Sequence, residues 1–430
     1  MGAALRVGLA GLGTVGAGVV QLLDKNGALV ARRAGRPIEI VAIAARDRAR
    51  DRGIALDRFA WEDDARALAA RSDIDVVVEL IGGSEGIALD LARATLAGGK
   101  AFVTANKAMI AQHGLELAAA GEAAEQPLKF EAAVAGGIPV IKGLREGAAA
   151  NELAQVGGIL NGTCNYILSA MDETGADFAA VLAEAQALGF AEADPSFDVD
   201  GVDAAHKLAV LASLAFGTQV AFAQVATRGI REVLAGDIAE ARALGYKVRL
   251  VGQAEAGEDG LLQRVGPCLV ACEHPLASVR GAMNAVVAEG NFVGRLFFEG
   301  RGAGAGPTAS AVVADLIDIA RGEAGPAFAM PVASLTAATQ ADAGARTERT
   351  YLRFIVEDRP GVLAEITAAM RDGGVSIASM IQRDRADAGG GVLVALTTHE
   401  GQASGVAAAL AKLHGSPSLK AEPMVMPIIG

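Results

Sequence analysis

Apolar runs of strand length alternate with helix-length segments over the first 125 or so residues. Each run is followed by a segment with helical periodicity before the next run begins. The runs are LRVGLAG at 5–11, IEIVAIA at 38–44, DVVVELIG at 75–82 and KAFVTAN at 100–106. This rhythm predicts a parallel sheet wound with helices, an α/β domain of the Rossmann type over residues 1–130.

The rest of the chain divides into further regions. Residues 131–305 mix strand-like runs, such as LLQRVGPCLVAC at 261–272, with a long helix after Asp203, which predicts an α+β domain. The weakly patterned segment 323–348, rich in Ala, Gly and Thr, is expected to be a linker. Residues 349–430 have the compact pattern of a small βαββαβ sandwich. Because this pattern is complete in itself, we expect a separate module whose removal cuts few contacts.

Composition and charge narrow the class of protein. The chain has 430 residues, of which 52% are hydrophobic, and a formal net charge of −12. This charge argues against nucleic acid as a partner, because phosphates demand a basic surface. The uncharged stretch 208–226 is interrupted by Gly217 and Thr218, so it predicts a buried helix and a turn rather than a membrane span. Three cysteines without a signal-peptide pattern indicate reduced thiols and a cytoplasmic protein.

The turn after the first apolar run has the glycine spacing of a dinucleotide-binding loop. Such glycines permit a tight turn and let the backbone approach a pyrophosphate, which faces the N-terminus of the next helix. We expect cofactor contacts along the loop, from Gly11, Leu12, Gly13, Thr14, Val15 and Gly16. The alternative is a tight turn that binds no ligand.

The second apolar run ends in AIAARDR, which bears on the choice of cofactor. Arg46 is placed to meet the 2′-phosphate of NADP, whereas Asp47 would suit the ribose hydroxyls of NAD. NADP is therefore favoured and NAD stays open. Ordinary surface charge is the remaining interpretation of these residues.

Five carboxylates crowd the segment AEADPSFDVDGVDAAHK at 191–207. Asp203 and Lys207 are four residues apart with the acid first, the favourable order for an ion pair on a helix. The same helical face continues to Val210 and Leu214, so Lys207 is expected to point inward. An inward lysine beside a carboxylate is a candidate for proton transfer, and the alternative is a surface lysine whose stem packs along the helix. The acids suit a cationic substrate group better than a metal, because they lack metal-ligand spacing.

Six motifs in order make the whole chain resemble homoserine dehydrogenase, the NAD(P)-dependent enzyme that interconverts aspartate 4-semialdehyde and homoserine. They are GLGTVG at 11–16, TANK at 104–107, FEAAVAGGIPVI at 130–141, GILNGTCNYIL at 158–168, GFAEADPSFDVDGVDAAHKLAVLASLAFG at 189–217 and GRGAGAGPTASAVVADL at 300–316. The resemblance implies that residues 131–305 bind substrate and mediate dimerisation. It also implies that a helix at 306–322 completes the Rossmann domain and that the chain forms a homodimer or homotetramer.

Carried over by position, the resemblance implies that Lys207 is the catalytic acid–base residue and that Asp203 holds it. Lys107 in TANK corresponds to a lysine that faces nicotinamide and substrate. Glu192 and Asp198 correspond to substrate-contacting acids. Thr163 corresponds to a further substrate contact, and Gly304 corresponds to a cofactor contact. The resemblance also implies a loop whose carbonyls hold a monovalent cation, sodium or potassium, through Glu131, Val134, Gly136 and Ile138.

The tail resembles an ACT domain, a module that commonly binds amino acids, through DRPGVLAEIT at 358–367. Asp358 and Gly361 bracket a turn that leads to a helix N-terminus, where backbone N–H groups can receive a carboxylate. We expect an amino-acid effector there, and the resemblance suggests threonine. One departure from the family pattern is Phe190, where some relatives have tyrosine, which bears only on a hydroxyl contact.

Two other functions fit parts of the pattern. An aspartate semialdehyde dehydrogenase would need a cysteine nucleophile, and Cys164 lies in a glycine-rich turn, but no histidine pattern accompanies it. An amino-acid sensor with a vestigial Rossmann part would have no need of Asp203 and Lys207. Turnover of homoserine with NADP separates the three functions.

Overall fold

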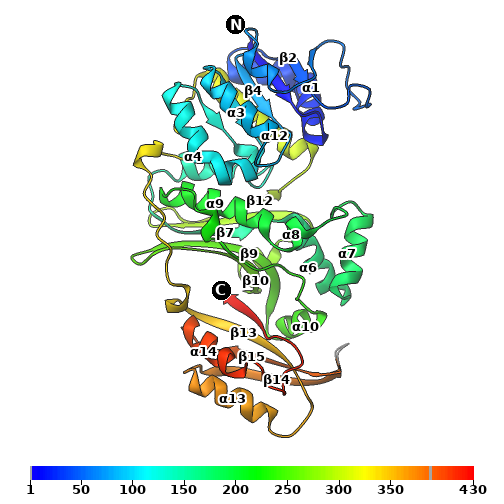
Figure 1. Ribbon diagram of the computed structural model, residues 1–430, viewed down its shortest axis with the longest axis vertical. Coiled ribbons are helices and arrows are strands. Elements are labelled where there is room, and N and C mark those ends of the chain that lie inside the picture. Colours follow the sequence, from blue (N-terminus) through cyan, green and yellow to red (C-terminus); the bar gives the residue numbers. More distant parts are fainter. Residues whose placement is uncertain (1, 387–389) are drawn as a thin grey trace.

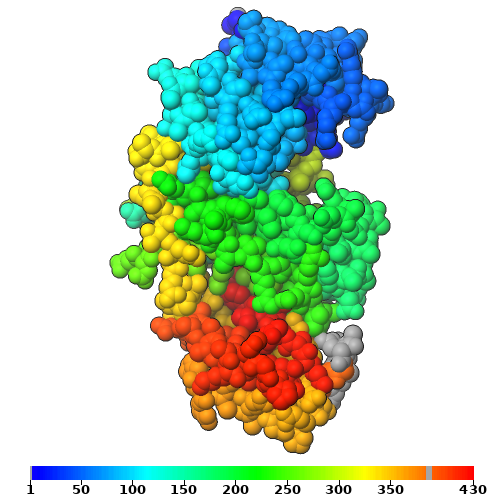
Figure 2. All heavy atoms as spheres, viewed as in Figure 1, coloured from blue at the N-terminus to red at the C-terminus, as the bar shows by residue number. Residues whose placement is uncertain are grey.

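The structure is a computed structural model that describes residues 2–386 and 390–430. Figure 1 shows three regions stacked along the long axis, with the N-terminal region at one end and the C-terminal region at the other. The yellow segment in Figure 2 runs along one flank of the middle region and links its two neighbours. Isolated bridges between Thr218 and Thr336 and between Leu261 and Gln340 fasten this segment to the middle region.

A six-stranded parallel sheet forms the N-terminal region. Its strands are β1 (Leu5–Ala10), β2 (Ile38–Ala44), β3 (Ala60–Glu62), β4 (Val76–Glu79), β5 (Ala101–Thr104) and β6 (Leu128–Lys129). The connecting helices are α1 (Thr14–Ala34), α2 (Ala67–Ala70), α3 (Ile87–Ala97) and α4 (Lys107–Ala123). The order β3-β2-β1-β4-β5-β6 is that of a doubly wound dinucleotide-binding sheet. The predicted Rossmann-type sheet is confirmed.

A helix from far along the chain packs against this region. α12 (Ala305–Arg321) lies beside α1, so close that a Cβ on Gly18 would come within 2.8 Å of the Ala305 carbonyl oxygen. Pro307 lies in its first turn, as predicted. The helix begins and ends one residue earlier than expected. It ends at Arg321 because Gly322 takes a left-handed conformation (φ 84°).

The middle region is a largely antiparallel sheet with helices packed against it. Its strands are β7 (Leu153–Ile159), β8 (Ala226–Thr227), β9 (Tyr246–Gly257), β10 (Gly260–Ala271), β11 (Met283–Gly290) and β12 (Gly294–Arg301). Its helices are α5 (Val140–Lys142), α6 (Gly162–Thr174), α7 (Phe178–Ala187), α8 (Ser196–Val199), α9 (Val202–Phe216), α10 (Ala235–Ala243) and α11 (Pro275–Ser278). α9 contacts β7, β9 and β10 on one side and α4 on the other, so it separates this sheet from the N-terminal region (Figure 1).

The apolar stretch 208–226 contains the end of α9 and the turn after it. The helix ends at Phe216, and left-handed Gly217 (φ 62°) redirects the chain. Every residue from 203 to 214 is buried. Over the described ranges, no helix combines the length and the apolar character needed to cross a bilayer. The predicted buried helix and turn are confirmed.

The C-terminal region has the predicted βαββαβ order. Its elements are β13 (Thr347–Val356), α13 (Val362–Asp372), β14 (Ile377–Ala386), β15 (Val392–Thr398), α14 (Ala403–Leu413) and β17 (Met424–Ile429), with a two-residue strand β16 (Gly401–Gln402). Leu352, Phe354 and Val394 of the sheet pack with Ile366 and Ala409 of the helices to form its core.

This region is not an independent module, which corrects the expectation from sequence. β17 pairs with β13 on one side and with β10 on the other, so the two sheets merge into one of eleven strands. Asp237 of α10, fully buried, accepts hydrogen bonds from Tyr351 (3.0 Å) and Arg353 (3.1 Å) of β13. Removal of the tail would therefore cut a strand ladder and take two hydrogen-bond donors, Tyr351 and Arg353, away from Asp237.

We predict that deletion of residues 349–430 lowers the melting temperature and promotes aggregation, because Leu269 and Val270 of β10 lose their strand partner and Asp237 loses its cation. The measurement is thermal unfolding together with size-exclusion chromatography. A truncated chain that also carries Asp237→Asn should recover part of the lost melting temperature. A truncated chain that melts like the parent and stays monodisperse would show that the tail is a module after all.

Candidate active site

The start of α9 brings Asp203 and Lys207 together inside the protein. Gly201 in a left-handed conformation (φ 86°) turns the chain into the helix, and Asp203 lies in its first turn. Lys207 Nζ lies 2.7 Å from Asp203 Oδ2 and donates a further hydrogen bond to the Leu160 carbonyl at 2.7 Å. Lys207 is only 8% exposed and Asp203 4%. The predicted inward orientation of the lysine is confirmed.

A second lysine reaches the same carboxylate from the N-terminal region. Lys107, the first residue of α4, places Nζ 3.0 Å from Asp203 Oδ1 and 5.5 Å from the centre of the Phe197 ring. Its side chain is 30% exposed, the most open of the three. Asp203 therefore lies between two ammonium groups, one from each of two regions.

Lys107 is positioned by polar contacts at the carboxyl ends of β4 and β5. Glu79, fully buried at the end of β4, accepts hydrogen bonds from the Ile81 and Gly82 amides and from the Thr104 hydroxyl at 2.6 Å. Asn106 caps α4 by accepting from the Met109 amide at 3.1 Å. Helix α4 therefore starts at a fixed point, with Lys107 directed toward α9.

Asn161 connects the carboxylates of the acidic segment. Its Oδ1 caps α6 by accepting from the Cys164 amide at 2.8 Å. Its Nδ2 donates to Asp198 Oδ1 at 2.7 Å and to Asp203 Oδ2 at 2.8 Å. Thr163, in the first turn of the same helix, donates to the Phe190 carbonyl at 2.9 Å and lies 3.4 Å from Asp198 Oδ2. The start of α6 thus brings together three of the predicted site residues, Thr163, Asp198 and Asp203.

The two acids bridged by Asn161 differ in their affinity for protons. Burial raises the pKa of Asp198, and the neighbouring charge of Asp203 raises it further. Burial would also raise the pKa of Asp203, but the ammonium groups of Lys207 and Lys107 outweigh it and hold that pKa below its usual range. Asp203 is therefore the stronger acid of the two, and Asp198 is the one that protonates more readily.

Glu192 is the predicted substrate residue that this cluster does not include. Its side chain is exposed and makes no polar contact with the described residues of the cluster. Only its backbone is held, since its carbonyl accepts a hydrogen bond from the Gln186 amide group at 3.0 Å. The Phe190 ring, at the position where some relatives have tyrosine, stacks on the Tyr166 ring with centroids 4.4 Å apart.

The glycine loop has the close packing that its spacing predicts. A Cβ on Gly16 would come within 2.0 Å of the Gly11 carbonyl oxygen, and one on Gly11 within 2.5 Å of the Leu80 carbonyl oxygen. A Cβ on Gly13 would meet no atom within 4 Å, so that side of the turn is open to a ligand. Thr14 begins α1, and the loop is braced by Arg52, which donates to the Leu12 carbonyl at 2.9 Å.

The two residues considered for cofactor choice differ in their surroundings. Arg46 is exposed just beyond the end of β2. The Asp47 carboxylate is engaged locally, because it accepts a hydrogen bond from the Ala49 amide at 2.9 Å. Gly304 lies at the N-cap of α12, with a φ of 118° that a side chain would strain.

The segment proposed for a cation forms a tight turn against α12 and β12. Ala135 and Gly136 both have left-handed backbones (φ 55° and 53°), and a Cβ on Gly136 would come within 2.3 Å of the Gly302 carbonyl oxygen. The Val134 and Gly136 carbonyls accept no hydrogen bond from residues that the structure describes. The Ile138 carbonyl accepts one from Val140 at 2.7 Å.

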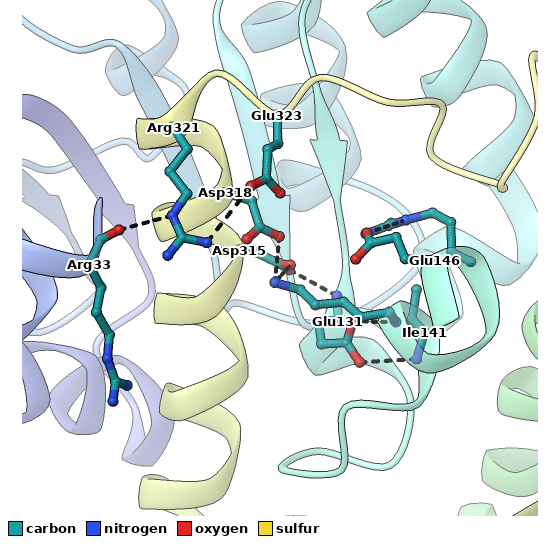
Figure 3. A network of polar contacts seen from close by, with 10 residues as sticks. Arg33, Glu131, Ile141, Glu146, Asp315, Asp318, Arg321 and Glu323 are labelled. Carbon is teal, nitrogen blue, oxygen red and sulfur yellow. Dashed lines mark hydrogen bonds and ion pairs between the residues drawn. The ribbon is translucent and has the colours of Figure 1, made fainter. Parts of the chain in front are cut away.

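Glu131 is held by the network drawn in Figure 3, which ties this segment to α12. Its carboxylate accepts from the Ile141 and Lys142 amides at 3.0 and 2.9 Å, and its own amide donates to Asp315 at 2.9 Å. Lys142 pairs with Asp318. Burial, with a contribution from the charge of Asp315, raises the pKa of Glu131 to about 7.

Comparison with known proteins agrees with this geometry. The family model for the homoserine dehydrogenase NAD-binding domain matches residues 11–131, that for homoserine dehydrogenase matches 139–317, and the ACT domain model matches 350–415. The homoserine dehydrogenase of Pseudomonas aeruginosa is 44% identical to this chain over 96% of each protein. The chain belongs to the homoserine dehydrogenase family. It is accordingly an NAD(P)-dependent oxidoreductase with an ACT domain.

Solved structures of homoserine dehydrogenases share the fold. The crystal structure from Thiobacillus denitrificans is 42% identical, covers 99% of this chain and 98% of its own, and superposes with a TM-score of 0.92. A hyperthermophilic archaeal homoserine dehydrogenase in complex with NADPH is 26% identical with a TM-score of 0.64. It covers 73% of this chain and 97% of its own, so about a quarter of this chain has no counterpart there.

The Cys164 thiol of this chain is not accessible as a nucleophile. The thiol is fully buried, and burial raises its pKa well above the usual range. A reactive cysteine needs the opposite, an accessible thiolate. The structure therefore gives no support to the aspartate semialdehyde dehydrogenase alternative.

Two asparagines and one acid that organise the site are not among the residues predicted from the sequence. Asn161 stands directly before a helix start, where asparagine is a preferred cap. Asn106 does the same before α4. Glu79 is the single charged residue inside the run VVVELIG, and a charge in a buried strand is a signal of a specific polar role. These signals were present but need the tertiary contacts to be interpreted.

We predict that Asp203→Asn destabilises the fold by about 3 kcal/mol or more, because two buried or half-buried lysines lose their shared anion. Chemical denaturation at neutral pH measures this. The folded pKa of Asp203 is depressed below its ordinary 3.8. Its contribution is therefore present at any pH above that value and is lost only as the pH falls through the folded pKa.

The difference between parent and variant should accordingly stay constant from about pH 5 upward and narrow in stronger acid. Asp194→Asn, which changes an exposed acid of the same segment, is the control and should leave stability unchanged. If Asp203→Asn were as stable as that control, the ion cluster would not contribute to the free energy of unfolding.

Proposed function

We propose that Lys207 donates and accepts the proton in the interconversion of L-aspartate 4-semialdehyde and L-homoserine. The observation that carries this proposal is the buried cluster of Lys107, Asp203 and Lys207 at the junction of two regions. In this view residues 1–130 and α12 bind the cofactor, and residues 131–305 bind the substrate and mediate dimerisation. Residues 323–348 form a linker, and residues 349–430 form the regulatory domain.

Reduction of the aldehyde needs a hydride at carbon and a proton at oxygen. A bound reduced nicotinamide supplies the hydride. Lys207 would transfer a proton from Nζ to the carbonyl oxygen, so that the alcohol forms and the lysine is left neutral. Asp203 keeps the ammonium oriented, and Lys107 adds a second positive charge beside the developing oxyanion. In the reverse direction the neutral amine accepts the hydroxyl proton.

The acids around the cluster suit the amino end of the substrate. Asp198 lies beside Asn161 and Thr163, within the network that holds Asp203. Glu192 is exposed at the rim, so a contact with the substrate would require its side chain to turn inward when the ligand binds. We therefore propose Asp198 and Thr163 as the main contacts and Glu192 as an outer one.

Lys207→Met is expected to reduce kcat by about 100-fold or more, the usual contribution of a general acid. The variant keeps the length of the side chain and removes its proton. Cofactor binding, followed by nicotinamide fluorescence, should be unchanged. Lys25→Met, at an exposed position of α1, is the control and should behave like the parent. A Lys207→Met enzyme with more than about a tenth of the parent kcat would contradict the role.

We propose NADP as the preferred cofactor. Arg46 is exposed beyond β2 while the Asp47 carboxylate is committed to its own turn, which leaves the cation available for a 2′-phosphate. The contacts of the glycine loop with the pyrophosphate, and of Gly304 and Lys107 with the rest of the cofactor, are proposed on the same basis.

Arg46→Ala is then expected to raise KM for NADP by about tenfold or more, the loss of one charge-assisted contact. KM for NAD should stay the same, because NAD has no 2′-phosphate. Arg50→Ala, in the same exposed loop, is the matched control. Equal changes for the two cofactors would show that Arg46 does not recognise this phosphate.

We also propose that the turn 134–138 holds a monovalent cation, sodium or potassium. Carbonyl oxygens are ligands for such hard cations, and those of Val134 and Gly136 are free of hydrogen bonds to the described residues. The Ile138 carbonyl keeps a second lone pair, and Glu131 would contribute its own carbonyl. Activity that is the same in sodium, potassium and a bulky organic cation would argue against the site.

An amino acid, threonine by resemblance, is proposed as effector at the turn before α13. Gly361 has a left-handed backbone (φ 97°) at the N-cap, and a Cβ there would meet no atom within 4 Å, so the helix N-terminus is open. Asp358, exposed at the start of the turn, could receive the ammonium group. Asp358→Ala with unchanged threonine inhibition would place the effector elsewhere.

We propose a cytoplasmic homodimer or homotetramer. Support for assembly comes from exposed apolar side chains at the edge strand β12 and the turn before it, where Phe292 is 90% exposed and Phe297 37%. All three thiols, at 164, 268 and 272, are free, as expected in a reducing compartment. Light scattering of the purified protein tests the assembly, and cell fractionation tests the location.

A further inference from the structure

A small cavity at one flank of the middle region is lined by more cations than anions. It lies among α6, α10, β9 and the turn after α11, with a volume of about 170 Å³. Its charged residues are Arg242, Lys247, Arg249, Arg280, Asp172 and Glu173. Four cations against two acids give a local surplus of positive charge in a chain whose net charge is −12.

Asp172 is already committed to two of the cations. It pairs with Arg242 at 2.6 Å and with Lys247 at 2.5 Å. Arg249 and Arg280 make no ion pair with a carboxylate in the described part of the chain. These two arginines are therefore the cations of the cavity that lack a carboxylate partner among the described residues.

Arg249 carries this charge inside the protein. It is only 2% exposed, and its terminal nitrogens donate to the Val248 and Ala277 carbonyls at 3.0 Å. Its Nε has no hydrogen-bond partner among the described residues. Burial lowers the pKa of Arg249, and the charge of the nearby Asp172 carboxylate only partly offsets this effect.

Ser169 is a second unpartnered donor at the same cavity. It lies in α6, is 6% exposed, and its Oγ forms no hydrogen bond with any described residue. Buried hydroxyl groups are normally hydrogen-bonded. Two donors from different elements thus lack partners around a single space, and no acceptor among the described residues satisfies them.

We propose that this cavity binds a small tetrahedral oxyanion, inorganic phosphate or a phosphoryl group, with Arg249 Nε and Ser169 Oγ as buried donors and Arg280 at the entrance. A dianion matches the surplus of positive charge. The volume exceeds the roughly 30 Å³ that one water takes in the liquid, so an ion of several heavy atoms fits. The C-terminal turn of α6 disfavours an anion, and the four cationic side chains offset this.

The cavity is separate from the active site. Asn161 at the N-cap of α6 contacts Asp203, whereas Asp172 and Glu173 are in the last turn of that helix. A helix of 13 residues is about 20 Å long. Ligands of the cavity therefore do not compete directly with substrate.

Isothermal titration calorimetry with inorganic phosphate tests the site. The protein is saturated with NADPH beforehand, so that phosphate cannot occupy the dinucleotide loop. The parent should show saturable binding with one ion per chain. Arg280→Ala and Ser169→Ala should each weaken binding, by about tenfold for the charged residue. Arg66→Ala, at an exposed arginine of the N-terminal region, is the control and should bind like the parent.

Methyl phosphate distinguishes the two sources of the ligand. Binding as tight as that of inorganic phosphate would support a phosphoryl group of a larger molecule, and much weaker binding would support the free ion. Arg249→Met should lose phosphate binding and, without phosphate, melt at the parent temperature or above it, because an unmatched buried charge is removed.

Three outcomes would overturn the proposal. Equal phosphate affinity in the parent, Arg280→Ala and Ser169→Ala would indicate an adventitious ion only. A parent that binds no phosphate, with Arg249→Met strongly destabilised, would make Arg249 a structural residue beside a water-filled cavity. Dissociation of the oligomer in Arg280→Ala, without phosphate binding by the parent, would assign the counter-charge to a carboxylate of a second copy.

Discussion

The carboxylate of Asp203 is the point on which the arrangement of the site depends. A buried anion is tolerated only when cations and hydrogen bonds surround it, and here Lys207, Lys107 and Asn161 all meet it within 3.0 Å. Two of these partners belong to the middle region and one belongs to α4 of the N-terminal region. Because Asp203 needs cations from both regions, it also helps to set the position of the N-terminal sheet relative to α9.

The same groups that shape the helix ends also shape the site. Asn106 and Asn161 each use Oδ1 to cap a helix, and each uses Nδ2 for a second contact, to the Gly83 carbonyl at 2.6 Å and to the carboxylates of Asp198 and Asp203 respectively. The capping bond sets where the helix begins, and the second bond sets what lies next to it. A substitution of either asparagine would thus alter local structure and active-site geometry together.

Local patterns predicted the elements well, and long-range contacts are what they could not supply. The inward position of Lys207 followed from helical phase, because that phase depends only on neighbours along α9. That Lys107 would share the same carboxylate depends on the packing of two regions, which no local pattern encodes. The βαββαβ order of the tail was likewise predicted, but that its last strand, β17, also pairs with β10 of the middle region depends on a long-range contact.

The position of β17 also changes how regulation through the tail has to be understood. Leu269 and Val270 of β10 pair with Ile428 and Ile429 of this strand, and its other edge pairs with β13. α10 joins the two regions a second time, because Asp237 binds β13 while the helix packs against α6. A displacement of the tail must therefore either break strand pairing or move the sheet beneath α9. Since α6 begins at the asparagine that holds Asp203, packed elements connect the turn before α13 with the ion cluster without interruption. An amino acid that binds one arrangement of the tail more tightly than another would bias the geometry of the ion cluster through these packed elements.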